Sequence, residues 1–288
     1  MTDKICPSEI LFLNNQFYFM SKQFKTIKPI SAKQTLWSTL DIPVETILQQ
    51  IPDTKNLIHP IKGIVVEYNN QTLGIPYEYL IPNYDYKTTI LLFHGFNSAP
   101  ENKQALINQW LIDNNLSDRI DLIAPQLNYN PNEAIQQIGS IIQEHYGNII
   151  VIGTSLGGFY ANYIRAMNQT DQIKVHAINP SWSPGISLKK EVNKPQINLK
   201  TKENWIFTDA YLNYLAHFEK ACKVELKHYN STNYTLHLAT ADELLSFDDM
   251  ISYINDNKVP NKLYFYDTNH RFETVNELLE NIKHELIP

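Results

Sequence analysis

Glycine, cysteine and long apolar runs are all scarce in this sequence. The 288 residues include nine glycines and two cysteines. Cys6 and Cys222 lack the Cys-x-x-Cys spacing of a metal site, so we expect no metal and favour two unpaired thiols over one disulfide. No apolar run reaches the roughly 18 residues that a transmembrane helix needs, so we expect no membrane span.

Positive charge is also in short supply, because 30 Asp and Glu residues outnumber 24 Lys and Arg residues. The two signs are interspersed, and the formal net charge is −6. A nucleic-acid-binding protein usually needs a basic face, so the composition argues against that class. The first 20 residues lack a basic segment followed by a clean apolar stretch, so we expect no signal peptide and a cytoplasmic protein.

Three of the nine glycines lie within six positions around one serine. The stretch GTSLG at residues 153–157, followed by Gly158, matches the Gly-x-Ser-x-Gly nucleophile elbow, a sharp strand-to-helix turn that exposes the serine oxygen. Glycines avoid side-chain clashes in such a turn. An apolar strand is expected directly before the motif and a helix directly after it. We therefore predict that Ser155 is a nucleophile and not part of an ordinary Gly-Ser turn.

Apolar, strand-forming runs alternate with helical patterns through most of the chain. The runs lie at residues 88–93, 119–127, 148–153, 174–180, 233–240 and 262–267. Helices are expected from about residue 100, where Ser98 and Glu101 have capping-box spacing, and over 130–147, 156–169, 246–256 and 273–287. This order predicts an α/β fold, with a mainly parallel sheet covered by helices on both faces and ligands beyond the carboxyl ends of its strands.

The first 60 residues differ from the rest because they contain no glycine. We expect them to form an N-terminal extension of unknown role, with short helices over 31–40 and 42–51. This extension is a candidate surface for self-association into an oligomer.

The remaining chain, residues 61–288, is expected to form the α/β domain. A hairpin is expected over 63–81, turning at an Asn-Asn pair, and it is a candidate for antiparallel leading strands of the sheet. Residues 181–223 show no strand-helix alternation and include two prolines within the first fifteen residues. We expect this segment to pass over the sheet as a cap-like excursion, ending in a helix that Thr208 or Asp209 caps.

A second part of the active site is expected where the strand at 88–93 ends in His94 and Gly95. The loop at this place must present a backbone N–H to the substrate oxygen, so we predict an oxyanion hole formed by the N–H groups of Phe96 and Leu156. Gly95 allows the backbone to approach closely. His94 lies at the end of a buried strand, so we expect it to hold the loop by hydrogen bonds and not to act as a base.

The catalytic base and acid are expected after Ser155 in the chain, in the order acid and then histidine. Six histidines follow Ser155, but only His270 lies after a strand end and before the final helix. Asp242 follows the preceding strand, where a carboxylate can hold the imidazole in one tautomer. Glu243 is expected to face solvent or to cap a helix, and Asp267 is the remaining rival for the acid.

One aromatic residue is a candidate contact for the substrate. Trp182 follows the strand at 174–180, at the edge of the sheet where ligands are expected. It is predicted either to line the substrate pocket or to pack in the core.

The runs ILLFHGFNSAPENKQA, VIGTSLGGFYANYI, AINPSW, TADELLSFDDM and NHRF resemble, in this order, the YqiA-type esterases, which are small bacterial α/β-hydrolases. The resemblance covers residues 88–288. It implies an α/β-hydrolase fold, a triad of Ser155, Asp242 and His270, and esterase activity on short acyl esters without a cofactor. Two positions depart from the family pattern: Ala241 replaces a glycine before the acid, and Asn269 replaces an aspartate before the histidine.

The sequence therefore predicts a serine esterase that hydrolyses short-chain carboxylic esters through an acyl-enzyme. A thioesterase and an acyltransferase share this machinery and are alternatives, since the pocket selects the acceptor. A binding protein that keeps the fold without catalysis is a further alternative, although all three triad positions are filled.

Overall fold

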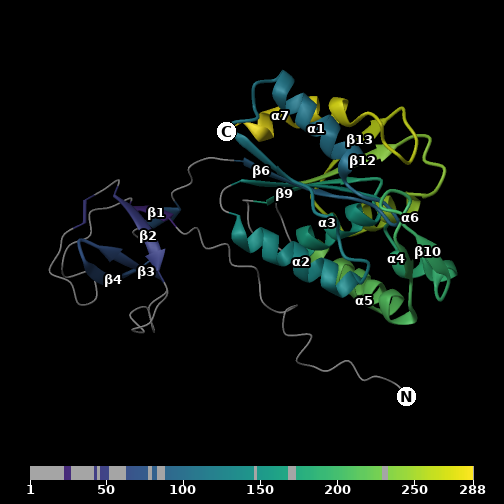
Figure 1. Ribbon diagram of the computed structural model, residues 1–288, viewed down its shortest axis with the longest axis horizontal. Coiled ribbons are helices and arrows are strands. Elements are labelled where there is room, and N and C mark those ends of the chain that lie inside the picture. Colours follow the sequence, from purple (N-terminus) through teal and green to yellow (C-terminus); the bar gives the residue numbers. More distant parts are fainter. Residues whose placement is uncertain are drawn as a thin grey trace, which may run out of the picture. The chain divides into compact units, whose positions relative to one another are not determined.

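The computed structural model describes residues 23–26, 42–43, 46–51, 63–76, 80–82, 88–145, 148–167, 173–228 and 233–287. The described residues form two compact units, one within Phe19–Tyr86 and the other within Lys87–Pro288. Figure 1 draws the larger unit as a sheet enclosed by helices and the smaller one as a group of short strands.

The larger unit is built on a six-stranded sheet in which all five strand pairs are parallel. The central strands β6 and β8 are buried at every position, which explains their continuous apolar sequences. In spatial order the strands are β13 (Lys262–Tyr266), β12 (Tyr234–Ala239), β9 (Ile173–Ile178), β8 (Ile149–Thr154), β6 (Thr88–Phe93) and β7 (Ile120–Ile123).

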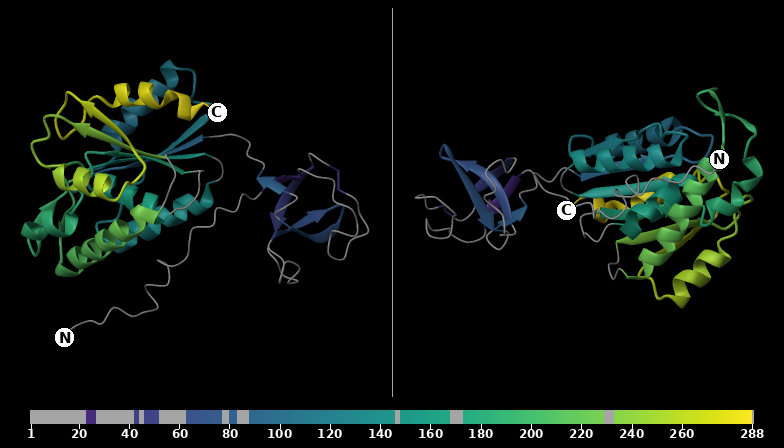
Figure 2. Two further views of the ribbon diagram at one scale, coloured as in Figure 1. Left: turned by 180° about the vertical axis from the view of Figure 1, so that it is seen from behind. Right: turned by 90° about the horizontal axis from the view of Figure 1, so that it is seen from below.

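Helices cover both faces of this sheet, as the sequence predicts (Figures 1 and 2). On one face lie α1 (Glu101–Asp113) and α7 (Val275–Leu286); on the other lie α2 (Pro131–Glu144), α3 (Leu156–Met167) and α5 (Asp209–Glu225). The core beneath α1 and α7 includes Ile90, Leu92, Ile107, Trp110, Ile150, Ile152, Leu278, Leu279 and Ile282, all buried. One further helix, α6 (Asp248–Asp256), lies between β12 and β13 in the chain.

Two of the predicted helix starts can be checked at their caps. The Asn130 side chain accepts a hydrogen bond from the Asn132 N–H at 3.1 Å, which confirms the start of α2. The capping box predicted at Ser98 is wrong, because Pro100 occupies the N-cap of α1 and no side chain caps the helix. The Ser98 carbonyl instead accepts a hydrogen bond from the Asn198 side chain at 2.9 Å, so tertiary contacts fix this residue outside the helix.

The segment at 181–223 forms a small structure of short helices and strands. It contains α4 (Pro184–Ser187), a 3-10 turn (Lys189–Glu191), β10 (Pro195–Ile197), β11 (Asn204–Ile206) and most of α5. Strands β10 and β11 pair only with each other, antiparallel, and do not join the six-stranded sheet. The Thr208 side chain accepts a hydrogen bond from the Tyr211 N–H at 3.3 Å and so caps α5. A further 3-10 turn, Leu226–His228, follows α5.

The smaller unit is an antiparallel five-stranded sheet. Its strand order is β4 (Gln71–Pro76), β3 (Gly63–Tyr68), β2 (Ile47–Ile51), β1 (Gln23–Thr26) and β5 (Leu80–Pro82). Its core consists of Ile42, Leu48, Val66, Leu73 and Ile75. The turn at Asn69 and Asn70 has φ angles of 49° and 60°, which suits a tight hairpin.

Two expectations for this region are wrong. The segment expected as a helix over 42–51 contains strand β2, because pairing with β1 and β3 outweighs its local helical pattern. The hairpin expected to supply leading strands of the larger sheet pairs instead with β2 in the small sheet. The boundary expected at residue 60 falls between β2 and β3, which are neighbours in the small sheet.

The helix expected over 31–40 lies outside the described residues, and so does Cys6. Cys222 is a buried free thiol.

A buried carboxylate fastens α7 to the large sheet. Glu285 is 9% exposed and lies 3.7 Å from Lys174 Nζ, 3.5 Å from His176 Nε2 and 3.5 Å from Lys262 Nζ. Burial by itself raises the pKa of the Glu285 carboxyl, but the contact with His176 and the charges of Lys174 and Lys262 outweigh burial and lower the pKa to about 2. The carboxylate is therefore charged in the fold at every ordinary pH.

We predict that this group makes stability depend on acid pH. An ordinary Glu pKa is 4.5, so the stabilisation is complete above that value and is lost as the pH falls from 4.5 toward about 2. Replacing Glu285 by Gln should remove on the order of 3 kcal/mol from the free energy of unfolding at pH 7 and flatten its decline in acid. Urea denaturation at several pH values measures both effects, with the exposed Glu277→Gln as control on the same helix. Parallel pH curves for wild type and Glu285→Gln would contradict the prediction.

Candidate active site

Ser155 lies in a turn that only small neighbours permit. It joins β8 to α3 and has a φ of 57°, in the left-handed region that side chains disfavour. A Cβ on Gly153 would stand 2.1 Å from the Gly157 carbonyl oxygen, and one on Gly157 would stand 2.3 Å from the Phe93 carbonyl oxygen. The scarce glycines are therefore concentrated where the backbone segments approach most closely.

Hydrogen bonds of the Ser155 backbone hold the serine turn against the end of β9. The Ser155 N–H donates to the Ile178 carbonyl at 2.9 Å, and the Ser155 carbonyl accepts from the N–H groups of Phe159 and Ser181, both at 3.0 Å. Leu156 is the first residue of α3, and the N–H groups of a first helical turn have no partner within the helix. The positive end of the α3 dipole therefore lies next to the serine oxygen.

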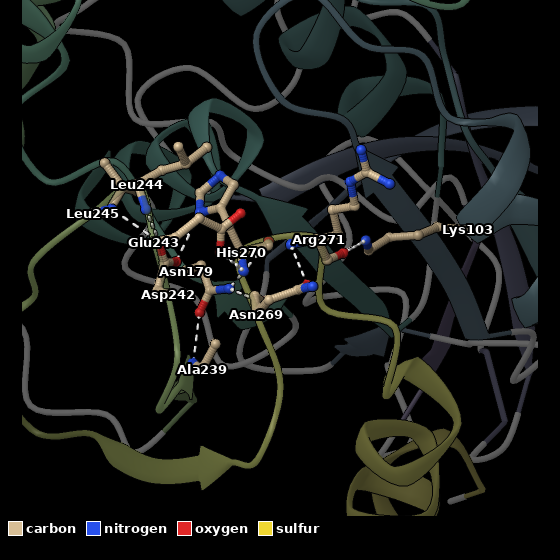
Figure 3. Close-up of polar contacts among 10 residues, drawn as sticks. All are labelled: Lys103, Asn179, Ala239, Asp242, Glu243, Leu244, Leu245, Asn269, His270 and Arg271. Atoms are coloured by element: carbon tan, nitrogen blue, oxygen red, sulfur yellow. Dashed lines mark hydrogen bonds and ion pairs between the residues drawn. The ribbon is translucent and has the colours of Figure 1, made fainter.

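The predicted base and acid are in direct contact. The loops after β12 and β13 meet because these strands are parallel neighbours, with Ala239 paired to Tyr266. Asp242 Oδ2 accepts a hydrogen bond from His270 Nδ1 at 2.7 Å (Figure 3). With Nδ1 bound to a carboxylate, Nε2 is the ring nitrogen that can accept a proton. The rival acid, Asp267, is exposed just after β13.

The second oxygen of the carboxylate is also engaged. Asp242 Oδ1 accepts hydrogen bonds from the N–H groups of Leu244 and Leu245, at 2.9 and 2.8 Å. The Asp242 side chain is 2% exposed and that of His270 is 13% exposed. Both oxygens of the buried carboxylate are therefore held in a fixed orientation, which favours one position of the imidazole.

Asn179 links the histidine loop to the serine turn, a role that the sequence patterns do not predict. Its Nδ2 donates to the His270 carbonyl at 3.2 Å, and its Oδ1 accepts from the Ala239 N–H at 2.8 Å (Figure 3). It directly follows Ile178, whose carbonyl binds the Ser155 N–H. Asn179 is fully buried with a φ of 41°, and an asparagine directly after a strand was the only signal for it in the sequence.

The histidine loop has two further supports. Glu243 is exposed, as expected, but its Oε2 also accepts a hydrogen bond from the His270 N–H at 3.0 Å, and this bond lowers the pKa of the Glu243 carboxyl. Lys103 of α1 donates from Nζ to the Arg271 carbonyl at 2.5 Å. Burial lowers the pKa of Lys103 to about 8. Contacts on both sides therefore hold the backbone around His270.

The loop after β6 lies against the serine turn. A Cβ on Gly95 would stand 3.1 Å from the Ser155 Cβ, which confirms the close approach expected at this glycine. His94 Nε2 accepts a hydrogen bond from the Leu127 N–H at 2.9 Å, so Nδ1 carries the proton and donates it to the Gly95 carbonyl at 2.9 Å. Burial lowers the pKa of His94, which keeps the ring neutral. The structural role predicted for His94 is confirmed.

The β10–β11 hairpin holds the same loop from the other side. Asn97 Oδ1 accepts from Trp205 Nε1 at 2.8 Å, and Asn97 Nδ2 donates to Gln196 Oε1 at 2.8 Å. The Asn97 carbonyl accepts from the Leu199 N–H at 3.0 Å. The Phe96 ring packs against Trp205, with ring centroids 5.3 Å apart. The side chain of Phe96 is therefore engaged with the hairpin, and its proposed role in the oxyanion hole concerns only its backbone N–H.

Trp182 lies close to the serine turn in space, although the two are far apart in sequence. Its neighbour Ser181 donates its N–H to the Ser155 carbonyl. The Trp182 side chain is 9% exposed and packs against Tyr253 of α6, with ring centroids 5.2 Å apart, and beneath Lys223 Nζ at 5.1 Å. These contacts describe core packing at the edge of the site, and a contact with substrate stays a prediction.

The arrangement of sheet and helices identifies the class of fold. The structure of Est1E from Butyrivibrio proteoclasticus superposes with a TM-score of 0.53 at 13% identity, over 78% of this chain and 99% of that one. A monoacylglycerol lipase from Paleococcus ferrophilus gives a TM-score of 0.51 at 16% identity, over 69% and 93% of the two chains. An S-formylglutathione hydrolase from Staphylococcus aureus gives 0.50 at 13%, over 73% and 91%. The fold is that of the α/β-hydrolases.

The sequence itself places the chain within a family. Residues 89–286 match the family described as "Uncharacterised protein family (UPF0227)". The chain belongs to this family, in agreement with its resemblance to the YqiA-type esterases. Among the residues that the structure describes, no helix has the length and apolar character needed to cross a membrane. The same residues contain no group of three or more His, Cys, Asp or Glu side chains placed to hold a metal ion.

We predict that the turn at Ser155 costs stability, and that glycine would relieve the cost. Ser155→Gly can adopt a φ of 57° without strain, whereas Ser155→Ala retains it. The glycine variant should therefore unfold with a free energy about 1 kcal/mol higher than the alanine variant. Chemical denaturation of the two variants measures the difference. If the alanine variant is equally or more stable, the turn stores no strain.

Proposed function

We propose that the protein is a serine hydrolase of carboxylic esters that works through an acyl-enzyme. The observation that carries the proposal is the 2.7 Å contact between Asp242 and His270, on a loop that Asn179 links to the left-handed turn of Ser155. Asp242 orients the imidazole and stabilises its cation, so that Nε2 can act as the base. The buried position of the pair keeps this orientation without reorganisation.

The proposed reaction has two halves, acylation and deacylation of Ser155, and the same groups act in both. As Ser155 Oγ attacks the ester carbonyl carbon, His270 Nε2 takes the hydroxyl proton, and then gives it to the leaving alcohol. The acyl group remains on Ser155. A water molecule then attacks the acyl carbon, gives its proton to His270, and releases the carboxylic acid as Ser155 regains its hydrogen. No metal, oxidant or cofactor is needed for the balance of these steps.

The negative charge that develops on the carbonyl oxygen needs hydrogen-bond donors. We assign this role to the backbone N–H groups of Phe96 and Leu156, as predicted from the sequence. The position of Leu156 at the start of α3 supports its part, because the helix dipole favours a negative charge there. The close approach of Gly95 to Ser155 supports the part of the neighbouring Phe96.

The leaving group distinguishes this proposal from its nearest alternatives. A thioesterase or an acyltransferase would use the same three residues. Among the similar structures, one is an S-formylglutathione hydrolase and another is a monoacylglycerol lipase. We commit to short-chain oxygen esters with water as acceptor, and thioesters and added alcohols serve as competitors in the test.

We predict that short p-nitrophenyl esters are turned over and that each triad residue is needed. Ser155→Ala should lower kcat by at least about 10³-fold, and Asp242→Asn by a similar factor, because neither the nucleophile nor the oriented base then remains. Asp267→Asn, the rival acid, is the matched control and should retain activity. Steady-state kinetics over a series of acyl lengths, beside matched thioesters, measures both effects.

Three outcomes would contradict the proposal. Equal turnover by wild type and Ser155→Ala would show that Ser155 is not the nucleophile. Activity lost in Asp267→Asn and kept in Asp242→Asn would assign the acid wrongly. A folded wild-type protein that hydrolyses none of the esters would favour a non-catalytic binding protein on this fold.

We call the loop after β6 the oxyanion loop, because it carries the Phe96 N–H assigned to the oxyanion hole. We predict that the hydrogen bonds of Asn97 position this loop. Trp205→Phe removes the 2.8 Å bond to Asn97 Oδ1 and keeps an aromatic ring that can stack on Tyr129, whose ring centroid lies 4.5 Å from that of Trp205. Asn97→Gly keeps the left-handed φ of 52° and removes both side-chain bonds. Each variant should lower kcat about tenfold with little change in KM, since the donor is misplaced mainly for the transition state. An unchanged kcat in both variants would show that the hairpin does not position the loop.

A further inference from the structure

The β10–β11 hairpin has an inner and an outer face of different character. Cross-strand partners share a face of a sheet, and here Gln196 pairs with Trp205. These two side chains point inward to Asn97, and Gln196 is buried. The alternate residues lie on the outer face, where Ile197 is 54% exposed and Ile206 is 56% exposed.

A third apolar side chain extends this outer face. Leu199 lies two residues beyond the end of β10 and is 69% exposed, although its backbone N–H is bound to the Asn97 carbonyl. We call Ile197, Leu199 and Ile206 the hairpin patch. Its backbone is held by strand pairing and by hydrogen bonds to the oxyanion loop. Three large apolar side chains presented to water on a fixed support indicate a surface that meets an apolar phase.

The charge around the hairpin patch is opposite to that of the whole chain. Residues 186–206 contain five lysines and two glutamates, which gives a formal charge of +3, whereas the whole chain carries −6. All five lysines are exposed: Lys189, Lys190, Lys194, Lys200 and Lys202.

Both glutamates of this segment have partners within the chain. Glu203 Oε2 accepts from the Tyr129 hydroxyl at 2.7 Å, and Glu191 Oε2 accepts from Gln196 Nε2 at 3.3 Å. The two glutamates offset only two of the five lysine charges, and the lysines belong to the same segment of the chain as the hairpin patch.

We infer that the hairpin patch docks the protein on an anionic lipid surface. Exposed apolar side chains enter the interfacial layer of a bilayer, and lysines beside them are attracted to anionic headgroups. Burial of three such side chains and the attraction of several lysines are together enough for reversible binding. A second copy of this chain fits less well as the occupant, because it would bring two positively charged segments together.

The position of the hairpin patch adds a consequence for the substrate, which rests on the proposed function. The inner face of the same hairpin binds Asn97 of the loop that approaches Ser155, so a lipid surface docked on the outer face would lie across the hairpin from that loop. Esters that partition into the bilayer would then be concentrated near the site.

Vesicle sedimentation tests the docking without requiring catalysis. The full-length protein should sediment with vesicles of phosphatidylcholine mixed with phosphatidylglycerol, less with phosphatidylcholine alone, and less as salt is added. The double variant Ile197→Thr/Ile206→Thr, which keeps β-branched residues in both strands, should lower the apparent affinity at least about tenfold. Lys194→Ala/Lys200→Ala should lower it by about the same factor on the anionic vesicles only. The matched control is Ile112→Thr, because Ile112 is 58% exposed on α1.

Circular dichroism and turnover of a water-soluble ester check that the hairpin variants keep their fold. The inference is overturned if wild type does not bind the anionic vesicles, if the double variant binds as wild type does, or if Ile112→Thr loses as much affinity. A dimer in sedimentation velocity that Ile197→Thr/Ile206→Thr abolishes would assign the patch to a second copy and also overturn it. A protein that binds vesicles and hydrolyses no ester would contradict the proposed function and leave the docking intact.

Discussion

The active-site region depends on how closely the start of α3 approaches the end of β6. That approach exists because Gly157 has no Cβ, which would otherwise stand 2.3 Å from the Phe93 carbonyl oxygen. It brings the loop after β6 against Ser155, and so places the two backbone segments assigned to the oxyanion hole side by side. A chain with only nine glycines has three of them here because a side chain would push these segments apart.

The other half of the site depends on strand order. Asp242 and His270 are 28 residues apart in sequence, and they meet because β12 and β13 are parallel neighbours with loops at the same edge. Asn179 at the end of β9 binds both the histidine loop and the backbone of β12. The strand ends therefore determine where the loops that carry Asp242 and His270 begin. Short hydrogen bonds are then enough to hold these two side chains in place.

Much of this architecture could be predicted from the sequence, because it follows from local patterns and chain order. The continuous apolar runs of the large sheet, the cap at Asn130 and the pairing of Asp242 with His270 all have such signals. Strand β2 and the β10–β11 hairpin have no such local signal, because their strands pair although the local sequences favour no strand. The role of Asn179 depends on three segments meeting in space. Ser98 has the spacing of a cap, but the N-cap of α1 is Pro100, two residues later.

The central claim is that Ser155 is a hydroxyl activated by His270. The most direct measurement is to treat the native protein with a fluorophosphonate probe, digest it and map the adduct by mass spectrometry. We predict a single adduct on Ser155 in the wild type, and a large loss of labelling rate in His270→Gln because the base is then absent. An adduct on another residue, or a folded wild type that is never labelled, would contradict the claim.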